Sequence, residues 1–290
     1  MNVKLDIVIL GGTGFIGGHL SSRLTTLGHR VKVFGRTAFR SVDSLAELIS
    51  GCDLLIMLAG ANVGQRWSKA HKQQVWNSRI LTNQMLMEAL LVCKQPPQRI
   101  FSASGVGLYP QSDYSHPLDE SCFQIGDNSL GRLGLAWEEA SQALQPAPVI
   151  FRFGVVLGTN GGALSKMLPA FKLGLGGPIA DGRQSFSWIH IDDLVNAFVF
   201  AIDHPEMEGA YNLVAPQPLS NAAFGRILAK VLKRPFWLSL PDWLLRYILG
   251  EGAQVLTLSI AVFPKRLSEI GFEFRYPDAK SALSDLLKRG

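Results

Sequence analysis

Three glycines near the start of the chain, Gly11, Gly14 and Gly17, constrain its fold more than any other feature. They directly follow an apolar run rich in Val and Ile, Lys4 to Leu10, which is typical of a buried strand. Beyond them, apolar residues recur at steps of three and four, as in a helix that ends at Gly28: Phe15, Ile16, Leu20, Leu24 and Leu27. The alternating segment from Arg30 to Phe34 predicts a second strand. The opening segment therefore predicts a strand, a tight turn, a helix and a parallel strand.

A glycine loop between a strand and a helix is a common binding place for a pyrophosphate. One glycine permits the turn, one lets the backbone approach the phosphates, and one lets helix and strand pack closely. The free N–H groups and the dipole of the helix then favour the negative charge. The predicted contacts of this dinucleotide site are Gly11, Thr13, Gly14, Phe15, Ile16 and Gly17. A glycine-rich turn that binds no ligand remains the alternative.

The end of the second strand bears on the choice of dinucleotide. Sites that prefer NAD usually carry an acid there, which binds the ribose hydroxyls, but this chain has Phe34-Gly35-Arg36. A guanidinium suits a 2′-phosphate, which an acid would repel. We therefore predict NADP(H) as the cofactor, with Arg36 on the 2′-phosphate and Arg40 as a second candidate. An arginine that only faces solvent is the alternative.

Strand and helix patterns continue to alternate through the first half of the chain. Further buried strands are predicted at 53–58, 99–103 and 148–153, and helices at 68–93 and 130–144. This alternation predicts an α/β fold built on a doubly wound parallel sheet of the Rossmann type.

After Gly158, frequent glycines cut the chain into short pieces, which predicts a smaller C-terminal cap that binds the substrate. Helices are predicted there at 192–203, 220–232, 243–249, 264–270 and 278–287. We expect an NADP-binding Rossmann domain of residues 1–160 and 184–213, and a smaller domain of residues 161–183 and 214–290.

Composition narrows the class of protein. Hydrophobic residues make up 47% of the chain and charged residues 18%, so a large core is expected. The net charge of +5 comes from scattered Lys and Arg, which favours a small phosphate-bearing ligand over nucleic acid as the partner. Three widely spaced cysteines indicate neither a disulfide framework nor a zinc site, and suit a cytoplasmic location. No apolar run reaches the roughly 18 residues of a membrane span, and the glycines that follow the first apolar run argue against a secretion signal.

With these motifs in view, the chain resembles the extended short-chain dehydrogenase/reductases. The resemblance is carried by Gly11 to Gly17, Leu58-Ala59-Gly60 and Trp188 to Leu194. A more specific resemblance is to an atypical bacterial subgroup, the epimerase family proteins, which are related to sugar-nucleotide epimerases and are sometimes labelled cell-division-inhibitor-like. Its motifs span nearly the whole chain: Arg66-Trp67, Ser78-Arg79-Ile80, Gly161 to Leu164, Lys166 to Pro169, Gly174 to Pro178, Gly182-Arg183-Gln184 and Pro264 to Leu267.

The resemblance adds further candidate site residues. It implies that Leu58, Ala59 and Gly60 contact the cofactor and that Arg183 lies near the substrate. We place Gly162, from the Gly161-Gly162 segment, in the same cleft. A solvated Arg183 is the alternative.

Two departures from the extended family matter. The stretch between Arg36 and Asp53 is shorter than in the relatives, so the third strand and the residues that flank adenine are expected to be reduced. The extended family also uses a Tyr and, four residues later, a Lys, with a Ser upstream. Alignment through Trp137-Glu138 puts Leu130 and Gly134 at the Tyr and Lys positions, and neither can transfer a proton. The subgroup itself usually lacks this pair.

Two hydroxyls remain as catalytic candidates, Ser104 and Tyr109. Ser104 stands at the end of a predicted strand, the edge where α/β sheets bind ligands, and aligns with the active-site serine of the family. Tyr109 follows on the same approach and could replace the missing phenol. The alternatives are a serine bonded to a turn backbone and a tyrosine that packs beside Pro110.

Two functions remain open on the sequence alone. The first is an NADP(H)-binding oxidoreductase or epimerase-like enzyme that acts on a small polar substrate, nucleotide-linked substrates included. The second is a catalytically silent NADP(H)-binding sensor or interaction protein. No metal is predicted, because Asp192 fits a helix N-cap and His190 the end of a strand. The chain has neither a G-x-S-x-G nor an HExxH motif that would support a hydrolase.

Overall fold

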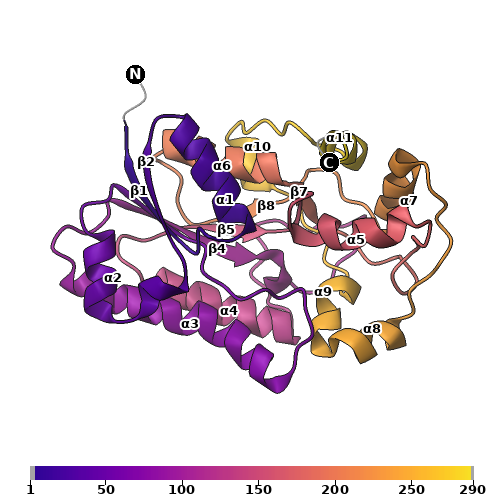
Figure 1. The fold of residues 1–290 in the computed structure, drawn as a ribbon, viewed down its shortest axis with the longest axis horizontal. Helices are drawn as coiled ribbons and strands as arrows, with labels where there is room; N and C mark the ends of the chain where they lie inside the picture. The colour runs from indigo at the N-terminus through magenta and orange to yellow at the C-terminus, as the bar shows by residue number, and fades with distance from the viewer. Residues whose placement is uncertain (1–3, 289–290) are drawn as a thin grey trace.

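The computed structural model describes residues 4–288, and its centre is a parallel sheet of six strands in the order β2-β1-β3-β4-β5-β8 (Figure 1). The strands are β1 (Asp6–Leu10), β2 (Arg30–Phe34), β3 (Leu54–Met57), β4 (Arg99–Gly105), β5 (Val149–Phe153) and β8 (Ala210–Leu213). Every neighbouring pair in this sheet is parallel. The predicted doubly wound α/β sheet is confirmed.

Helices cover both faces of the sheet. Figure 1 shows α1 and α6 on one face and α2, α3 and α4 on the other. Their bounds are α1 (Phe15–Thr26), α2 (Val42–Ile49), α3 (Lys69–Val92), α4 (Ser129–Gln142) and α6 (Ile191–Asp203). Successive side chains of a strand point to opposite faces, so Ile9 of β1 joins the core under α1 and Leu10 joins the core under α2 and α3. Both residues are fully buried.

The chain passes from β2 to β3 without a strand in between. Residues 36–49 form a short 3₁₀ helix, η1 (Arg36–Phe39), followed by α2, whose Leu45 and Ile49 are fully buried. β3 pairs with β1 on the side away from β2, so β2 is an edge strand of the described sheet. The expected reduction of the third strand is therefore confirmed.

Residues 155–190 are more regular than the glycine pattern predicted. Strands β6 (Val155–Leu157) and β7 (Trp188–His190) form a separate two-stranded parallel sheet, and α5 (Gly162–Lys172) lies between them in sequence. The expectation of short pieces was wrong at α5, because Gly161 and Gly162 begin this helix instead of interrupting one. Gly162 has a φ of +73°, which favours glycine at the helix start.

The predicted C-terminal helices are confirmed within a residue or two at their ends. They are α7 (Asn221–Leu232), α8 (Asp242–Leu249), α10 (Lys265–Glu269) and α11 (Ala279–Leu286), with a 3₁₀ turn η3 (Glu251–Ala253) and the short α9 (Gln254–Thr257) between α8 and α10. In residues 4–288 no helix has the length and apolar character that crossing a bilayer requires. The division into two domains stays a prediction.

Candidate cofactor and catalytic site

Two of the three predicted loop glycines are required by close backbone packing. Gly11 has a φ of +82°, and a Cβ on it would lie 2.5 Å from the amide nitrogen of Ala59. A Cβ on Gly17 would lie 2.3 Å from the Cα of Gly12, where the first turn of α1 packs on the loop. Real side chains do not tolerate such contacts. These glycines therefore hold the loop against the end of β3 and against the helix.

Gly14 differs from the other two, because it faces open space. A Cβ built on it would meet only the carbonyl oxygen of Gly11, at 3.4 Å. Gly14 is also the N-cap of α1, and no side chain caps the helix there. The first amides of a helix have no intrahelical acceptor, so the start of α1 presents N–H donors and the positive end of its dipole. This cradle fits a pyrophosphate group.

Arg36 lies beside the same loop, at the end of β2. It is the first residue of η1 and its side chain is exposed. The preceding Gly35 packs on Thr13, since a Cβ on Gly35 would be 3.1 Å from the Thr13 hydroxyl oxygen. Backbone bonds join the loop to β2, with the amide of Gly11 2.8 Å from the carbonyl oxygen of Phe34. Arg36 thus lies beside the glycine loop, and its contact with a 2′-phosphate stays a prediction.

Phe15 connects the glycine loop to the start of α5. A Cβ on Gly158 would lie 2.4 Å from Cζ of this ring, and one on Gly161 would lie 2.5 Å from its Cδ2. Gly162 is also near, with its Cβ position 3.2 Å from the ring. The glycines that begin the predicted substrate segment therefore make room for Phe15. Whether Phe15 and Gly162 contact ligands stays a prediction.

Ser104 belongs to a buried polar network between the sheet and α4. Its hydroxyl donates to Oε1 of Glu138 at 2.7 Å. Glu138 in turn accepts two hydrogen bonds from Arg152, from Nε at 2.8 Å and from Nη2 at 2.7 Å. Parallel pairing places Ser104, Arg152 and Asn212 side by side on three adjacent strands, which explains why these side chains share one face.

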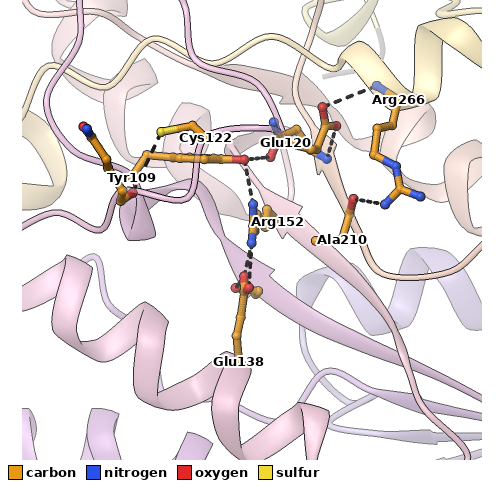
Figure 2. Close-up of polar contacts among 10 residues, drawn as sticks. Tyr109, Glu120, Cys122, Glu138, Arg152, Ala210 and Arg266 are labelled. Carbon is orange, nitrogen blue, oxygen red and sulfur yellow. Dashed lines mark hydrogen bonds and ion pairs between the residues drawn. The ribbon is translucent and has the colours of Figure 1, made fainter.

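Tyr109 is at the other end of this network and is fully buried. Its hydroxyl donates to Oδ1 of Asn212 at 3.0 Å. The same hydroxyl accepts a hydrogen bond from Nη1 of Arg152 at 2.7 Å (Figure 2). Burial raises the pKa of Tyr109 to about 12, although Arg152 opposes this shift. The structure thus brings Ser104 and Tyr109 into one network through Glu138 and Arg152. Their catalytic roles stay predictions, since both hydroxyls are engaged inside the protein.

A cavity of about 360 Å³ borders this network on the side of α4. Glu138 and Arg152 line it, together with Glu120 and Arg266 from other parts of the chain. Glu120 accepts a hydrogen bond from the backbone amide of Arg266 (Figure 2) and another from that of Asn212. Burial raises the pKa of Glu120 above its ordinary value. Only 6% of the Glu138 side chain is exposed, so the network meets the cavity along a narrow edge.

Gly134 of α4, at the predicted lysine position, has no room for a side chain. A Cβ on Gly134 would lie 2.9 Å from Cβ of Leu108 and 3.0 Å from its Cα, so the short 3₁₀ helix η2 (Val106–Leu108) packs directly on this glycine. Leu130, one turn earlier, packs on Gly107 of η2, since a Cβ built on Gly107 would lie 3.3 Å from Cβ of Leu130. A lysine at position 134 would displace η2.

Two further candidates lie apart from the network. Arg183 is an exposed turn residue whose amide donates to Asp181 at 3.0 Å, and its role near a substrate stays a prediction. His190 ends β7 and caps α6: its Nδ1 accepts the amide of Asp192 at 3.0 Å. The expected N-cap at Asp192 was therefore wrong by two residues. Nε2 of His190 lies 3.3 Å from a carboxylate oxygen of Asp285 in α11, so one ring nitrogen caps α6 and the other faces the C-terminal helix.

Glu138, Arg152 and Asn212 are members of the network that the sequence did not reveal. Glu138 was visible in the Trp137-Glu138 motif, but only as an anchor for alignment. Arg152 and Asn212 become visible only when strand register is known, because they join Tyr109 across long separations in sequence.

Two family models match the chain. The one described as the NAD dependent epimerase/dehydratase family matches residues 7–214, and one described as a domain of unknown function (DUF1731) matches residues 240–286. An epimerase family protein of Staphylococcus epidermidis, SERP0438, is 34% identical over 295 residues, which cover 97% of this chain and 98% of that protein.

Two solved structures extend the comparison. The human epimerase family protein SDR39U1, solved with NADPH, has a TM-score of 0.89 and 33% identity, with 98% of this chain and 99% of that chain covered. A nucleoside-diphosphate sugar epimerase from Corynebacterium glutamicum has a TM-score of 0.77 and 29% identity, with 98% of this chain and 58% of that chain covered. The resemblance inferred from the motifs is confirmed, and the chain belongs to the NAD dependent epimerase/dehydratase family.

Proposed function

We propose that this protein binds NADP(H) at the glycine loop. The observation that carries the proposal is the open cradle at Gly14, at the uncapped start of α1, with the exposed Arg36 beside it. The pyrophosphate would accept hydrogen bonds from the N–H groups of the first turn of α1, and Arg36 would bind the 2′-phosphate. The human relative that was solved with NADPH supports this choice of cofactor.

We further propose an oxidoreductase or epimerase-like activity on a small polar substrate, nucleotide-linked substrates included. When bound, NADP(H) supplies or accepts a hydride. The substrate would lie between the Rossmann domain (1–160 and 184–213) and the smaller domain (161–183 and 214–290), near Gly162 and Arg183. Ser104 is the proposed proton carrier. Its hydroxyl donates a hydrogen bond to Oε1 of Glu138 at 2.7 Å, so this carboxylate could take the hydroxyl proton when Ser104 receives one from the substrate.

A second candidate, a catalytically silent NADP(H) sensor, is favoured by a specific observation. The hydroxyls of Ser104 and Tyr109 both bond inward, and the usual Lys position at Gly134 is filled by η2. In this candidate the polar network stabilises the fold and the cofactor itself is the signal.

Thermal unfolding tests the cofactor proposal. A ligand at about 100 times its Kd stabilises the native state by about 2.7 kcal/mol, so saturating NADPH should raise the melting temperature. Gly14→Val should remove this shift, because its side chain would fill the cradle. Ser22→Val is a suitable control at an exposed position of the same helix. A melting temperature that responds to neither NADPH nor NADH would refute the proposal.

Turnover separates the two candidates. NADPH oxidation would be measured with a panel of carbonyl compounds and nucleotide sugars for the wild type, Ser104→Ala and Ser102→Ala. Loss of the proton carrier should reduce the rate by about 10²–10⁴. Ser102 is the matched control, because it lies on the same face of β4 as Ser104 and its hydroxyl bonds to Ser141 of α4. Background rates in wild type with intact NADPH binding would favour the silent sensor.

A further inference from the structure

Seven large apolar side chains are exposed in two segments that lie far apart in the sequence. One segment directly follows α5, and the other runs from the end of α7 into α8. We call these side chains the aromatic patch: Leu173, Leu175, Trp237, Leu238, Trp243, Tyr247 and Ile248. Trp243 is 70% exposed and Tyr247 is 77% exposed, so most of both side chains contacts solvent. Exposed apolar groups that gather in one place mark an interaction surface.

Hydrogen bonds join the two segments into one surface. The amide of Trp237 donates to the carbonyl oxygen of Gly176 at 2.9 Å, and its indole N–H donates to that of Gly174 at 3.0 Å. Just before α8, the amide of Leu240 donates to the carbonyl oxygen of Pro178 at 2.9 Å. Figure 1 shows α5, α7 and α8 together at the end of the molecule away from β2 and α2. The aromatic patch is therefore continuous and lies at this end.

Helix α8 carries the two most exposed rings of the patch. Trp243 and Tyr247 are one helical turn apart and share a face, whereas Leu245 between them is buried. The end of α8 is tied to the segment before α3, because the amide of Trp67 donates to the carbonyl oxygen of Leu249 at 3.0 Å. The helix is thus fixed on the protein and presents its aromatic face outward.

Positive charge accompanies the aromatic patch. Residues 140–180 and 209–241 contain no Asp or Glu. Three basic residues within these ranges directly adjoin patch residues in sequence or follow α7, and all three are exposed: Lys172, Lys233 and Arg234. Within residues 4–288 none of the three forms an ion pair. The surface around the patch is therefore both apolar and cationic.

We propose that the aromatic patch docks on an anionic phospholipid surface. Trp and Tyr side chains favour the boundary between lipid headgroups and acyl chains, because their rings are apolar and their N–H or O–H groups remain in contact with water. Lys and Arg beside such rings are attracted to the negative charge of the headgroups. The patch combines both features on one fixed surface, so the protein would bind the lipid surface from one side without inserting a helix across it.

The charge of the patch favours lipid over a second copy of this chain. In a two-fold dimer formed through the patch, the same surface would meet itself. Lys172, Lys233 and Arg234 would then approach their own copies, and facing like charges oppose association. An anionic lipid surface attracts all three residues at once and also accepts the exposed rings.

Sedimentation with lipid vesicles tests the proposal, with phosphatidylcholine alone and with phosphatidylcholine mixed with phosphatidylglycerol. The wild type should bind the anionic vesicles much more tightly than the neutral ones, and high salt should weaken the binding. Trp243→Ser/Tyr247→Ser should weaken binding by about tenfold or more, because two interfacial rings are lost. Lys233→Gln/Arg234→Gln should weaken it on the order of tenfold, because two cations are lost. All four positions are exposed, so both variants should keep the melting temperature of the wild type.

Two control variants make the same kinds of change elsewhere on the surface. Tyr114→Ser/Phe123→Ser removes two exposed rings, and Arg23→Gln/Lys94→Gln removes two exposed cations. Each control should change vesicle binding by less than about twofold, because charges and rings away from the docked face are screened by solvent.

Four outcomes would overturn the proposal. They are a wild type that does not bind anionic vesicles, a wild type that binds neutral vesicles equally well, patch variants that bind as tightly as their controls, and controls that bind as weakly as the patch variants. Binding to polyglutamate without binding to vesicles would instead assign the patch to an acidic protein. A wild-type dimer in sedimentation velocity that Trp243→Ser/Tyr247→Ser converts to a monomer, again without vesicle binding, would assign it to a second copy.

Discussion

Arg36 is the proposed selector between the two nicotinamide dinucleotides, because it is an exposed cation at the end of β2 beside the glycine loop. Arg36→Ala should weaken the binding of NADPH by about tenfold or more at low salt and leave the binding of NADH nearly unchanged. The reason is that a charge-assisted hydrogen bond contributes about 1.5–3 kcal/mol and only NADPH has the 2′-phosphate. Isothermal titration measures both constants. Arg40→Ala shows whether the next arginine shares the role. Equal losses for both cofactors in Arg36→Ala would exclude it as the selector.

The pKa of Tyr109 determines what this phenol can do. Burial raises it to about 12 from the ordinary 10.0, so Tyr109 remains protonated throughout the neutral range and acts there as a hydrogen-bond donor, not as a base. The absorbance titration of wild type minus Tyr109→Phe should show no phenolate below about pH 11 while the fold persists. A difference signal that rises near neutral pH would instead support tyrosinate catalysis.

The same substitution has a cost in stability. Tyr109→Phe leaves Oδ1 of Asn212 and Nη1 of Arg152 without their bond to the phenol, which should lower the free energy of unfolding by about 1–3 kcal/mol in urea at neutral pH. Tyr114→Phe is the matched control, because half of that side chain is exposed. If the two variants unfold at the same urea concentration, the buried hydrogen bonds contribute little.

The sequence singled out two residues of the buried polar network but not the residues to which they are hydrogen-bonded. Ser104 and Tyr109 could be found from a motif, since both follow a predicted strand. Glu138 and Arg152 could not, because their link depends on the register of β4 against β5 and on the side of α4 that faces the sheet. Short-range patterns contain no information on that register.

Elements with a strict apolar period were the easiest to predict. β1 and α1 match their expected bounds closely, because β1 is a continuous buried run and α1 buries residues at helical spacing. β2 also matches, although it buries no side chain fully and is held by its pairing with β1. α5 was missed, since its flanking glycines and the internal Pro169 hide a helical spacing of Leu164, Leu168 and Phe171. Its buried face becomes clear only in contact with the rest of the core.

Alanine substitution at two adjacent glycines of α1 should change the stability of the protein in opposite directions. Gly17→Ala would put a Cβ 2.3 Å from Cα of Gly12 and push the helix off the loop, with a cost of about 1–3 kcal/mol. Gly18→Ala meets nothing within 4 Å and is exposed, so it should stabilise the protein by about 0.4–1 kcal/mol. Urea unfolding of both variants measures the contrast, and equal shifts would contradict the packing described for the loop.

For the whole molecule, alternation of strands and helices predicted the parallel sheet but not the course of the chain after β8. That course depends on contacts between distant segments. Core residues that the sequence assigned to different domains, such as Phe101 and Leu283, belong to one continuous apolar cluster. Propensity and spacing cannot show which helix face meets which sheet face, so the C-terminal arrangement needed the structure.

One carboxylate illustrates how the C-terminal segment is held. Asp193 in the first turn of α6 is 1% exposed, and its two oxygens accept the backbone amides of Arg275 and Tyr276, both at 2.9 Å. Burial raises the pKa of Asp193, which its two amide donors oppose. Asp193 on α6 is therefore a polar anchor of the segment that leads into α11, which itself packs on α7.

Removal of that anchor should loosen the end of the chain. Asp193→Ala leaves two amides without acceptors and should lower the free energy of unfolding by about 2–4 kcal/mol, with faster proteolysis within residues 272–288. Asp203→Ala, at the exposed last residue of the same helix, removes a negative charge from the negative end of the dipole and should be neutral or slightly stabilising. Urea unfolding and timed trypsin digestion of the two variants measure both effects. If Asp193→Ala resists trypsin as well as Asp203→Ala does, the C-terminal segment is held mainly by the apolar contacts of α11, and the carboxylate is not its anchor.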